Sequence, residues 1–166
     1  MRETQYLISE DISSYRLEDM PLFSSLKAKY LDQLLSVCKI RSFDEGEVII
    51  KEGARDCWVY VLISGKVAVS IQTVEITVLF QRGDVFGESA FISQLPRSGT
   101  ITAQEPTECL AIDAVLLSEV HSSGNELFFA QFYHFLVRLL LQRLGLVNEE
   151  LVLVKRAFKM AVDRKK

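Results

Sequence analysis

The chain has 166 residues and a mass of 18.9 kDa, the usual size of one domain with a single core. Apolar residues make up 49% and charged residues 25%, which excludes a disordered chain, a collagen-like repeat and a low-complexity scaffold. The net charge of −3 gives no overall basic field to attract nucleic acid or anionic lipid. Three widely spaced cysteines form no disulfide framework and the first residues lack a secretory signal, so we expect a cytoplasmic protein.

The N-terminal part predicts an arm followed by a helix. Residues 1–19 are polar, mixed in charge and weakly periodic. Apolar residues then recur at helical spacing, at Leu26, Tyr30, Leu34, Leu35 and Cys38. The pattern predicts a helix capped by Ser24 or Ser25 that ends near Cys38.

Between Ile40 and Asp113 the sequence changes to short β-branched and aromatic runs separated by glycines. The predicted strands are Val48–Lys51, Trp58–Ile63, Lys66–Gln72, Glu75–Phe80, Gly99–Ala103 and Glu108–Ile112. Six short strands at this spacing are typical of an antiparallel roll or barrel.

After Asp113 the helical period returns, with a short helix at Ala114–His121, a break at Gly124-Asn125 and one long helix. Charged and polar residues interrupt the apolar stretch from Leu127 to Val147, so we interpret it as a soluble helix that needs an apolar partner.

The long helix carries an unbroken heptad seam, with steps of alternately three and four residues. The seam positions are Ala130, Tyr133, Val137, Leu140, Leu144, Val147, Leu151, Val154, Phe158 and Ala161. We expect a parallel homodimer through residues 130–161, in which Glu150 faces Lys155 of the second copy. The alternative is packing on its own domain, for which Leu139, Leu146 and Leu153 supply a second apolar stripe.

The segment from Gly83 to Thr100 combines glycines, a glutamate, small residues and an arginine. A helical turn starting near Gly87 exposes free N–H groups that attract anions, and Arg97 can hold a phosphate with two parallel hydrogen bonds. Glu88 accepts hydrogen bonds when ionised, which suits a sugar hydroxyl. Each feature alone is commonly structural, but their order and spacing together indicate a phosphate-binding site.

This segment resembles the phosphate-binding cassette of the cyclic nucleotide-binding domain family, which includes the catabolite activator protein and regulatory subunits of cyclic AMP-dependent kinase. Phe86-Gly87-Glu88 matches the start of the cassette, Ala90 its alanine, and Arg97-Ser98-Gly99-Thr100 its end. Further similarity lies in Leu22-Phe23 and in residues 43–49, 60–67 and 109–112, so the resemblance covers residues 20 to about 150. The chain is similar to stand-alone members of bacterial type.

The resemblance implies an α+β fold, an antiparallel, jelly-roll-like β-roll (double-stranded β-helix) flanked by an N-terminal helix and a long C-terminal helix. It implies a ligand site formed by Phe86, Gly87, Glu88, Ser89, Ala90, Arg97, Ser98 and Gly99. Arg97 would bind the exocyclic phosphate oxygens and Glu88 the ribose 2′-hydroxyl, while backbone N–H groups near Ala90 complete the cradle.

Three features of the ligand site follow from the same resemblance. Ser98 occupies a position where threonine often favours cyclic GMP through its hydroxyl group. Serine is also found there in proteins that bind cyclic AMP, such as the catabolite activator protein, so we expect cyclic AMP, with cyclic GMP as the alternative. Gly99 replaces a common alanine, which we expect to leave room for the ligand. The aromatic residues Phe128, Phe129, Phe132 and Tyr133 either belong to the core or cover the base.

The predicted organisation is an arm at 1–19, a cyclic nucleotide-binding roll at 20–123 and a dimerisation helix at 124–166. Both histidines, His121 and His134, lie outside the roll, so we expect no metal, no cofactor and no enzyme activity. We predict a receptor that signals through a hinge near 120–125 and the long helix to a separate, unidentified protein partner, without direct nucleic-acid or membrane binding. The alternatives are a non-binding dimeric scaffold and a truncated transcription regulator.

Overall fold

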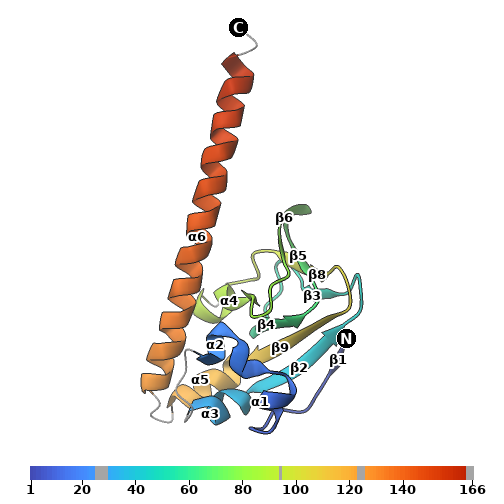
Figure 1. Cartoon of the computed structure of the whole chain (residues 1–166), viewed down its shortest axis with the longest axis vertical. Coiled ribbons are helices and arrows are strands. Elements are labelled where there is room, and N and C mark those ends of the chain that lie inside the picture. The colour runs from blue at the N-terminus through green and yellow to red at the C-terminus, as the bar shows by residue number, and fades with distance from the viewer. Residues whose placement is uncertain (25–29, 94, 123–125, 164–166) are drawn as a thin grey trace.

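The computed structural model describes residues 1–24, 30–93, 95–122 and 126–163. Two antiparallel sheets form a β-roll, short helices cover one end of it, and the long helix α6 runs past the roll and projects beyond it (Figure 1). This arrangement confirms the predicted α+β fold of an antiparallel roll between helices.

The first sheet has five strands and the second has four, and every pairing is antiparallel. In spatial order, the first sheet contains β1 (Arg2–Glu3), β2 (Cys38–Phe43), β9 (Thr107–Asp113), β4 (Trp58–Ser64) and β7 (Val85–Phe86). The second contains β3 (Val48–Ile50), β8 (Thr100–Ala103), β5 (Val67–Ile71) and β6 (Val74–Leu79). All six predicted strands are confirmed, with ends that differ by at most one residue.

Strands β4 and β9 are buried on both faces, and their alternating side chains divide the core in two. Leu62 and Cys109 point into the cluster between the two sheets, whereas Val61 and Leu110 point into the cluster beneath the helices. The first sheet is therefore the middle layer of the domain, and this position explains the uninterrupted apolar runs at 58–63 in β4 and 109–112 in β9.

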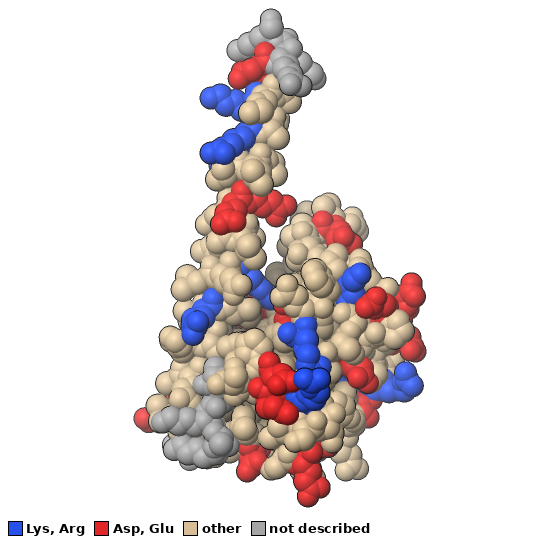
Figure 2. All heavy atoms as spheres, in the orientation of Figure 1, with Lys and Arg blue, Asp and Glu red and all other residues tan. Residues whose placement is uncertain are grey.

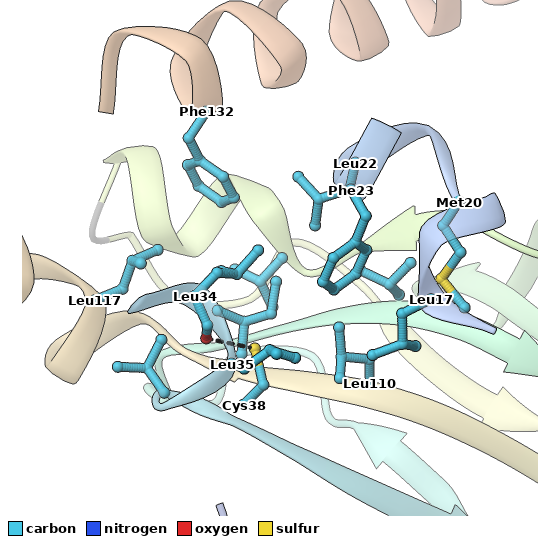
Figure 3. Packing of buried hydrophobic residues seen from close by; sticks show 14 of the residues in the cluster. Leu17, Met20, Leu22, Phe23, Leu34, Leu35, Cys38, Leu110, Leu117 and Phe132 are labelled. Atoms are coloured by element: carbon cyan, nitrogen blue, oxygen red, sulfur yellow. Dashed lines mark hydrogen bonds between the residues drawn. The ribbon is translucent and has the colours of Figure 1, made fainter. Parts of the chain in front are cut away.

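The helices among the described residues are α1 (Asp11–Ser14), α2 (Pro21–Ser24), α3 (Leu31–Leu35), α4 (Glu88–Ser93), α5 (Ala114–Ser122) and α6 (Glu126–Asp163), with a 3₁₀ turn at Leu17–Asp19. All of them except α4 contribute residues to the cluster that contains Val61 and Leu110. Figure 3 shows Phe132 of α6 pointing toward Leu34 of α3, beside Leu117 of α5. The first turns of α6 are thus fixed to the roll through Phe128, Phe129, Phe132 and Leu136, all buried.

The prediction of a helix that ends near Cys38 is wrong, because α3 ends at Leu35 and Cys38 begins β2. Cys38 continues the helical spacing of Leu34, but pairing with Ile112 of β9 places it in the sheet. Ser24 is the last residue of α2, and Ser25 lies outside the described residues. The predicted break at Gly124-Asn125 and part of the hinge lie outside them as well.

Two other expectations meet a mixed outcome. The arm at 1–19 contributes β1 to the first sheet and buries Leu7 and Leu17 in the core. In the stripe expected to dock α6 on its own domain, Leu139 packs against the core, whereas Leu146 and Leu153 are exposed. No helix among the described residues is long and apolar enough to cross a membrane.

We predict that Phe132→Ala lowers the free energy of unfolding by about 3–5 kcal/mol, because it leaves a cavity where α6 meets the roll. Phe80→Ala is the matched control, since Phe80 is 62% exposed and its loss should cost less than about 0.5 kcal/mol. Urea unfolding followed by circular dichroism measures both, and equal losses in the two variants would contradict this packing.

Candidate functional site

The cassette begins with a tight turn between β7 and α4 that the backbone of Gly87 makes possible. Gly87 has φ of +79°, which favours glycine. A Cβ atom at Gly87 would lie 2.8 Å from Nη1 of Arg97 and 2.9 Å from the carbonyl oxygen of Trp58. Glycine is therefore required here, because any side chain would displace the arginine beneath it.

Arg97 is a buried cation at the centre of the site, with 4% of its surface exposed. Its Nε donates to Oδ2 of Asp56 at 3.1 Å, and Nη2 donates to the other oxygen of the same carboxylate. Nη1 donates to the carbonyl oxygen of Gly87 at 2.6 Å and Nη2 to that of Trp58 at 2.5 Å. This pairing with Asp56 fixes the guanidinium plane beneath the cassette.

These contacts determine how Arg97 can receive an anion. Arg97 has five N–H donors, and its hydrogen bonds to described residues use four of them. A phosphate held by two parallel hydrogen bonds needs two donors, so at least one protein acceptor must give way. Asp56 and the two carbonyl groups are thus in direct competition with any bound phosphate.

The Asp56 carboxylate is half-buried at the edge of the site. Burial raises the pKa of Asp56, but the hydrogen bonds and the charge of Arg97 outweigh it, so the pKa lies below its usual value. The carboxylate therefore stays ionised near neutral pH and holds Arg97 in place.

Glu88, the second predicted site residue, is buried at the start of α4. Its Oε1 accepts a hydrogen bond of 2.8 Å from Nη1 of Arg143, which comes from α6. Nη2 of Arg143 also donates to the backbone carbonyl of Val85. The long helix is therefore tied to the cassette by a charged pair.

A cleft of about 1450 Å³ opens between the cassette, the hairpin of β5 and β6, and the middle of α6. Figure 2 shows a hollow between the projecting part of α6 and the neighbouring lobe of the roll. Five predicted residues that line it are Gly87, Glu88, Arg97, Ser98 and Gly99. The cleft is large enough for a nucleotide, because small-molecule sites commonly measure about 300–1,000 Å³.

The other predicted residues take different places. Ser89 and Phe86 also line the cleft, and the ring of Phe86 is buried and stacks on Tyr60 at a centroid distance of 5.2 Å. The side chain of Ala90 lies outside the described residues. Gly99 faces the sheet, since a Cβ there would lie 2.7 Å from the carbonyl oxygen of Ser70, so its small size also serves strand packing.

Three of the four aromatic residues considered for the base belong to the core, since Phe128, Phe129 and Phe132 are buried in the helical cluster. Tyr133 is 43% exposed, and none of the four lines the cleft. Later residues of α6 line it instead, among them Gln142, Leu146 and Glu150.

Sequence reasoning missed Asp56 and Arg143. Nothing in the spacing of Asp56 relates it to Arg97, 41 residues later. Arg143 did carry a signal, because it is one of two charged residues, with Arg138, in the mainly apolar stretch from Leu127 to Val147.

Comparisons with known proteins agree with this geometry. The family profile of the cyclic nucleotide-binding domain matches residues 40–123, about half of the chain. The fold and the cassette define a cyclic nucleotide-binding regulatory module. The chain belongs to the cyclic nucleotide-binding domain family.

Individual relatives are regulatory proteins and kinases. A cGMP-dependent protein kinase of Eimeria tenella is 40% identical over 122 residues, which are 72% of this chain and 12% of the kinase. A cAMP-dependent protein kinase regulatory subunit of Mycosarcoma maydis is 29% identical over 106 residues, 62% of this chain and 20% of the subunit. The chain thus spans less than a quarter of either relative.

A solved structure, the catabolite activator protein of Thermus thermophilus, superposes with a TM-score of 0.65 at 27% identity. The match covers 81% of this chain and 63% of that protein.

The ion pair with Arg97 predicts a pH-dependent contribution to stability. Because the folded pKa of Asp56 lies below the unfolded value of about 3.9, the pair stabilises the fold fully above that value. The contribution is lost as the pH falls through the lower folded pKa. Asp56→Asn should therefore be less stable than wild type at pH 7, and the difference should shrink at pH 3. Urea unfolding at both values measures it, and a difference that does not change with pH would contradict the ion pair.

Proposed function

We propose that the chain is a receptor that binds one cyclic nucleotide in the cleft and signals to a separate protein. The observation that carries this proposal is the placement of Arg97 and Glu88, a buried cation and a buried carboxylate, in the lining of one cleft. Arg97 binds the phosphate and Glu88 the ribose 2′-hydroxyl. Gly87, Ser98 and the backbone N–H groups near Ala90 complete the cradle.

Cyclic AMP is the first candidate ligand, as expected from Ser98, and the name of the Mycosarcoma maydis subunit supports it. Cyclic GMP is a second candidate because the Eimeria tenella kinase, at 40% identity, is named for cyclic GMP. Both ligands share the phosphate and the ribose, so Arg97 and Glu88 serve either one. Residues near the base, such as Ser98, which lines the cleft, then discriminate between the two nucleotides.

The proposed receptor performs no catalysis, acts in the cytoplasm and passes its signal through α6 to a protein partner of unknown identity. A bound nucleotide shifts a conformational equilibrium by its different affinities for two states. Two alternatives differ in what they bind: a dimeric scaffold has no nucleotide affinity, and a truncated transcription regulator has a nucleotide site but needs further chain to read DNA.

The proposed homodimer uses the seam of α6, most of which the domain leaves exposed, although Val147 also lines the cleft. The seam residues Val137, Leu144, Val147, Leu151, Val154 and Phe158 are between 46% and 71% exposed. Apolar residues at every seam position beyond residue 143 need burial, and a second copy presents the same seam in parallel. Figure 2 shows uncharged surface between groups of basic and acidic residues on the visible face of this projecting part.

Calorimetric titration with cyclic AMP and, separately, with cyclic GMP tests the receptor. Wild type should bind one of them with a roughly micromolar dissociation constant, and Arg97→Ala should weaken binding at least about a hundredfold because the phosphate loses its buried partner. Arg97→Lys should also weaken binding, since a point charge does not match the forked geometry.

A titration without measurable heat also results when the site already holds a nucleotide that was retained during purification. Denaturing the protein and analysing the released nucleotides by chromatography detects this. A wild-type protein that is silent with both ligands and releases none would contradict the receptor and favour the scaffold.

The dimer is tested with two neighbouring residues of equal exposure. Leu151 lies in the seam and is 46% exposed, whereas Val152 lies outside the seam and is 47% exposed. Leu151→Glu should convert the dimer to a monomer in sedimentation velocity, because it places a charge in the apolar seam, and Val152→Glu should remain dimeric. A wild type that sediments as a monomer at high concentration would contradict the seam.

A further inference from the structure

Arg41 of β2 is a second buried arginine, and it is not among the described residues that line the cleft. Only 8% of its surface is exposed. Its Nη1 donates to the hydroxyl of Tyr60 at 2.8 Å, and its Cζ lies 3.7 Å from the ring centroid of Trp58. Its Nε donates to Oε2 of Glu3 at 3.0 Å. Partners on β1 and β4 therefore hold this guanidinium in one place.

Trp58 connects Arg41 to the ion pair beneath the cassette. Arg41 lies over the ring of Trp58, whereas the backbone of Trp58 contacts both members of the pair. The Trp58 N–H donates to Oδ1 of Asp56 at 3.2 Å, and the Trp58 carbonyl accepts from Nη2 of Arg97 at 2.5 Å. Burial raises the pKa of Asp56, the hydrogen bonds and charge of Arg97 lower it, and the charge of Arg41 lowers it further. Two arginines and one aspartate thus meet around a single residue of β4.

The charge of Arg41 is only partly neutralised by its own partner. Glu3 accepts from Arg41 through one oxygen and from Nζ of Lys39 through the other, at 2.9 Å. These three groups have two positive charges and one negative charge, whereas Asp56 and Arg97 sum to zero. An incoming phosphate therefore meets a region with a positive charge in excess, and that excess lies behind Arg97 rather than on it.

Phosphate binding at Arg97 affects Asp56 most, because this carboxylate occupies two of the four donors in use. A phosphate that is held by two donors of Arg97 has to displace a protein acceptor. A partly buried carboxylate that loses its cation is costly unless another cation compensates for the loss. Arg41 meets this need, because it is already fixed beside Trp58.

We propose that Arg41 is a positioning residue whose charge stabilises the Asp56 carboxylate when a nucleotide phosphate displaces it from Arg97. The inference rests on the proposed function and adds to it a residue outside the cleft. The N-terminal arm takes part as well, because Glu3 of β1 is one of the groups that hold Arg41. Nucleotide affinity then depends on a charge that does not touch the ligand.

A double-mutant cycle tests the inference, with calorimetric titration of the nucleotide that the first experiment selects. Arg41→Gln should weaken binding about tenfold, which is within the usual range of coupling between neighbouring groups. In an Asp56→Asn background the same substitution should weaken binding less than about threefold, because no negative charge remains to be stabilised. A role in packing alone would give the same factor in both backgrounds, since Trp58 and Tyr60 are present in each.

Two further variants control for net charge and for folding. Arg2→Gln removes the same charge from β1, where the side chain is 80% exposed, and should bind within about twofold of wild type. If Arg41→Gln does not fold, as judged by circular dichroism, Arg41→Lys decides. It keeps the charge and loses the forked geometry, so its binding should stay within about threefold of wild type.

Four results would overturn the inference. The first is an equal loss from Arg41→Gln in both backgrounds, and the second is no loss from it at all. The third is a loss of about tenfold in Arg41→Lys, where that variant decides. The fourth is an Asp56→Asn variant that binds no nucleotide, because Asp56 would then be needed rather than displaced. In all four the wild type still binds, whereas a wild type with an empty site that binds no nucleotide overturns the proposed function too.

Discussion

The site depends on keeping the guanidinium of Arg97 buried and charged. A buried cation is stable only when its donors find acceptors, and here Asp56 and two backbone carbonyls provide them. This requirement explains why the turn contains Gly87, since a side chain there would collide with Arg97. It also bears on the proposed binding, because a phosphate bound to Arg97 would have to exchange with acceptors that the protein already supplies.

The helix α6 serves the domain with one face and leaves the other uncovered. Its inner face places Phe132 in the core and Arg143 on the cassette, so the helix is both a structural support and part of the site. Its outer face carries the exposed seam that includes Leu151. A shift of the helix relative to the roll would move Arg143 and change its hydrogen bond with Glu88, which lies 55 residues earlier in the sequence.

Local patterns predicted most of the fold, because strands such as Lys66–Gln72 alternate cleanly and the cassette is contiguous. They failed at Cys38, which continues a helical spacing but belongs to a strand. That strand pairs with β9, some 70 residues later in the sequence. Sequence reasoning singled out Arg97 and Glu88 because the cassette is contiguous, but it missed their partners because these lie far away in the sequence. Asp56 and Arg143 become neighbours of the cassette only through tertiary packing, which no local spacing records.

The central claim is that a nucleotide phosphate takes the place of a protein acceptor on Arg97, and nitrogen-15 NMR of the arginine Nε–H groups tests it most directly. The Arg97 signal is assigned from its loss in Arg97→Lys. On saturation with the nucleotide, it should move to a new position while the signal of the exposed Arg156 stays in place. An Arg97 signal that does not change at saturating nucleotide would contradict the account.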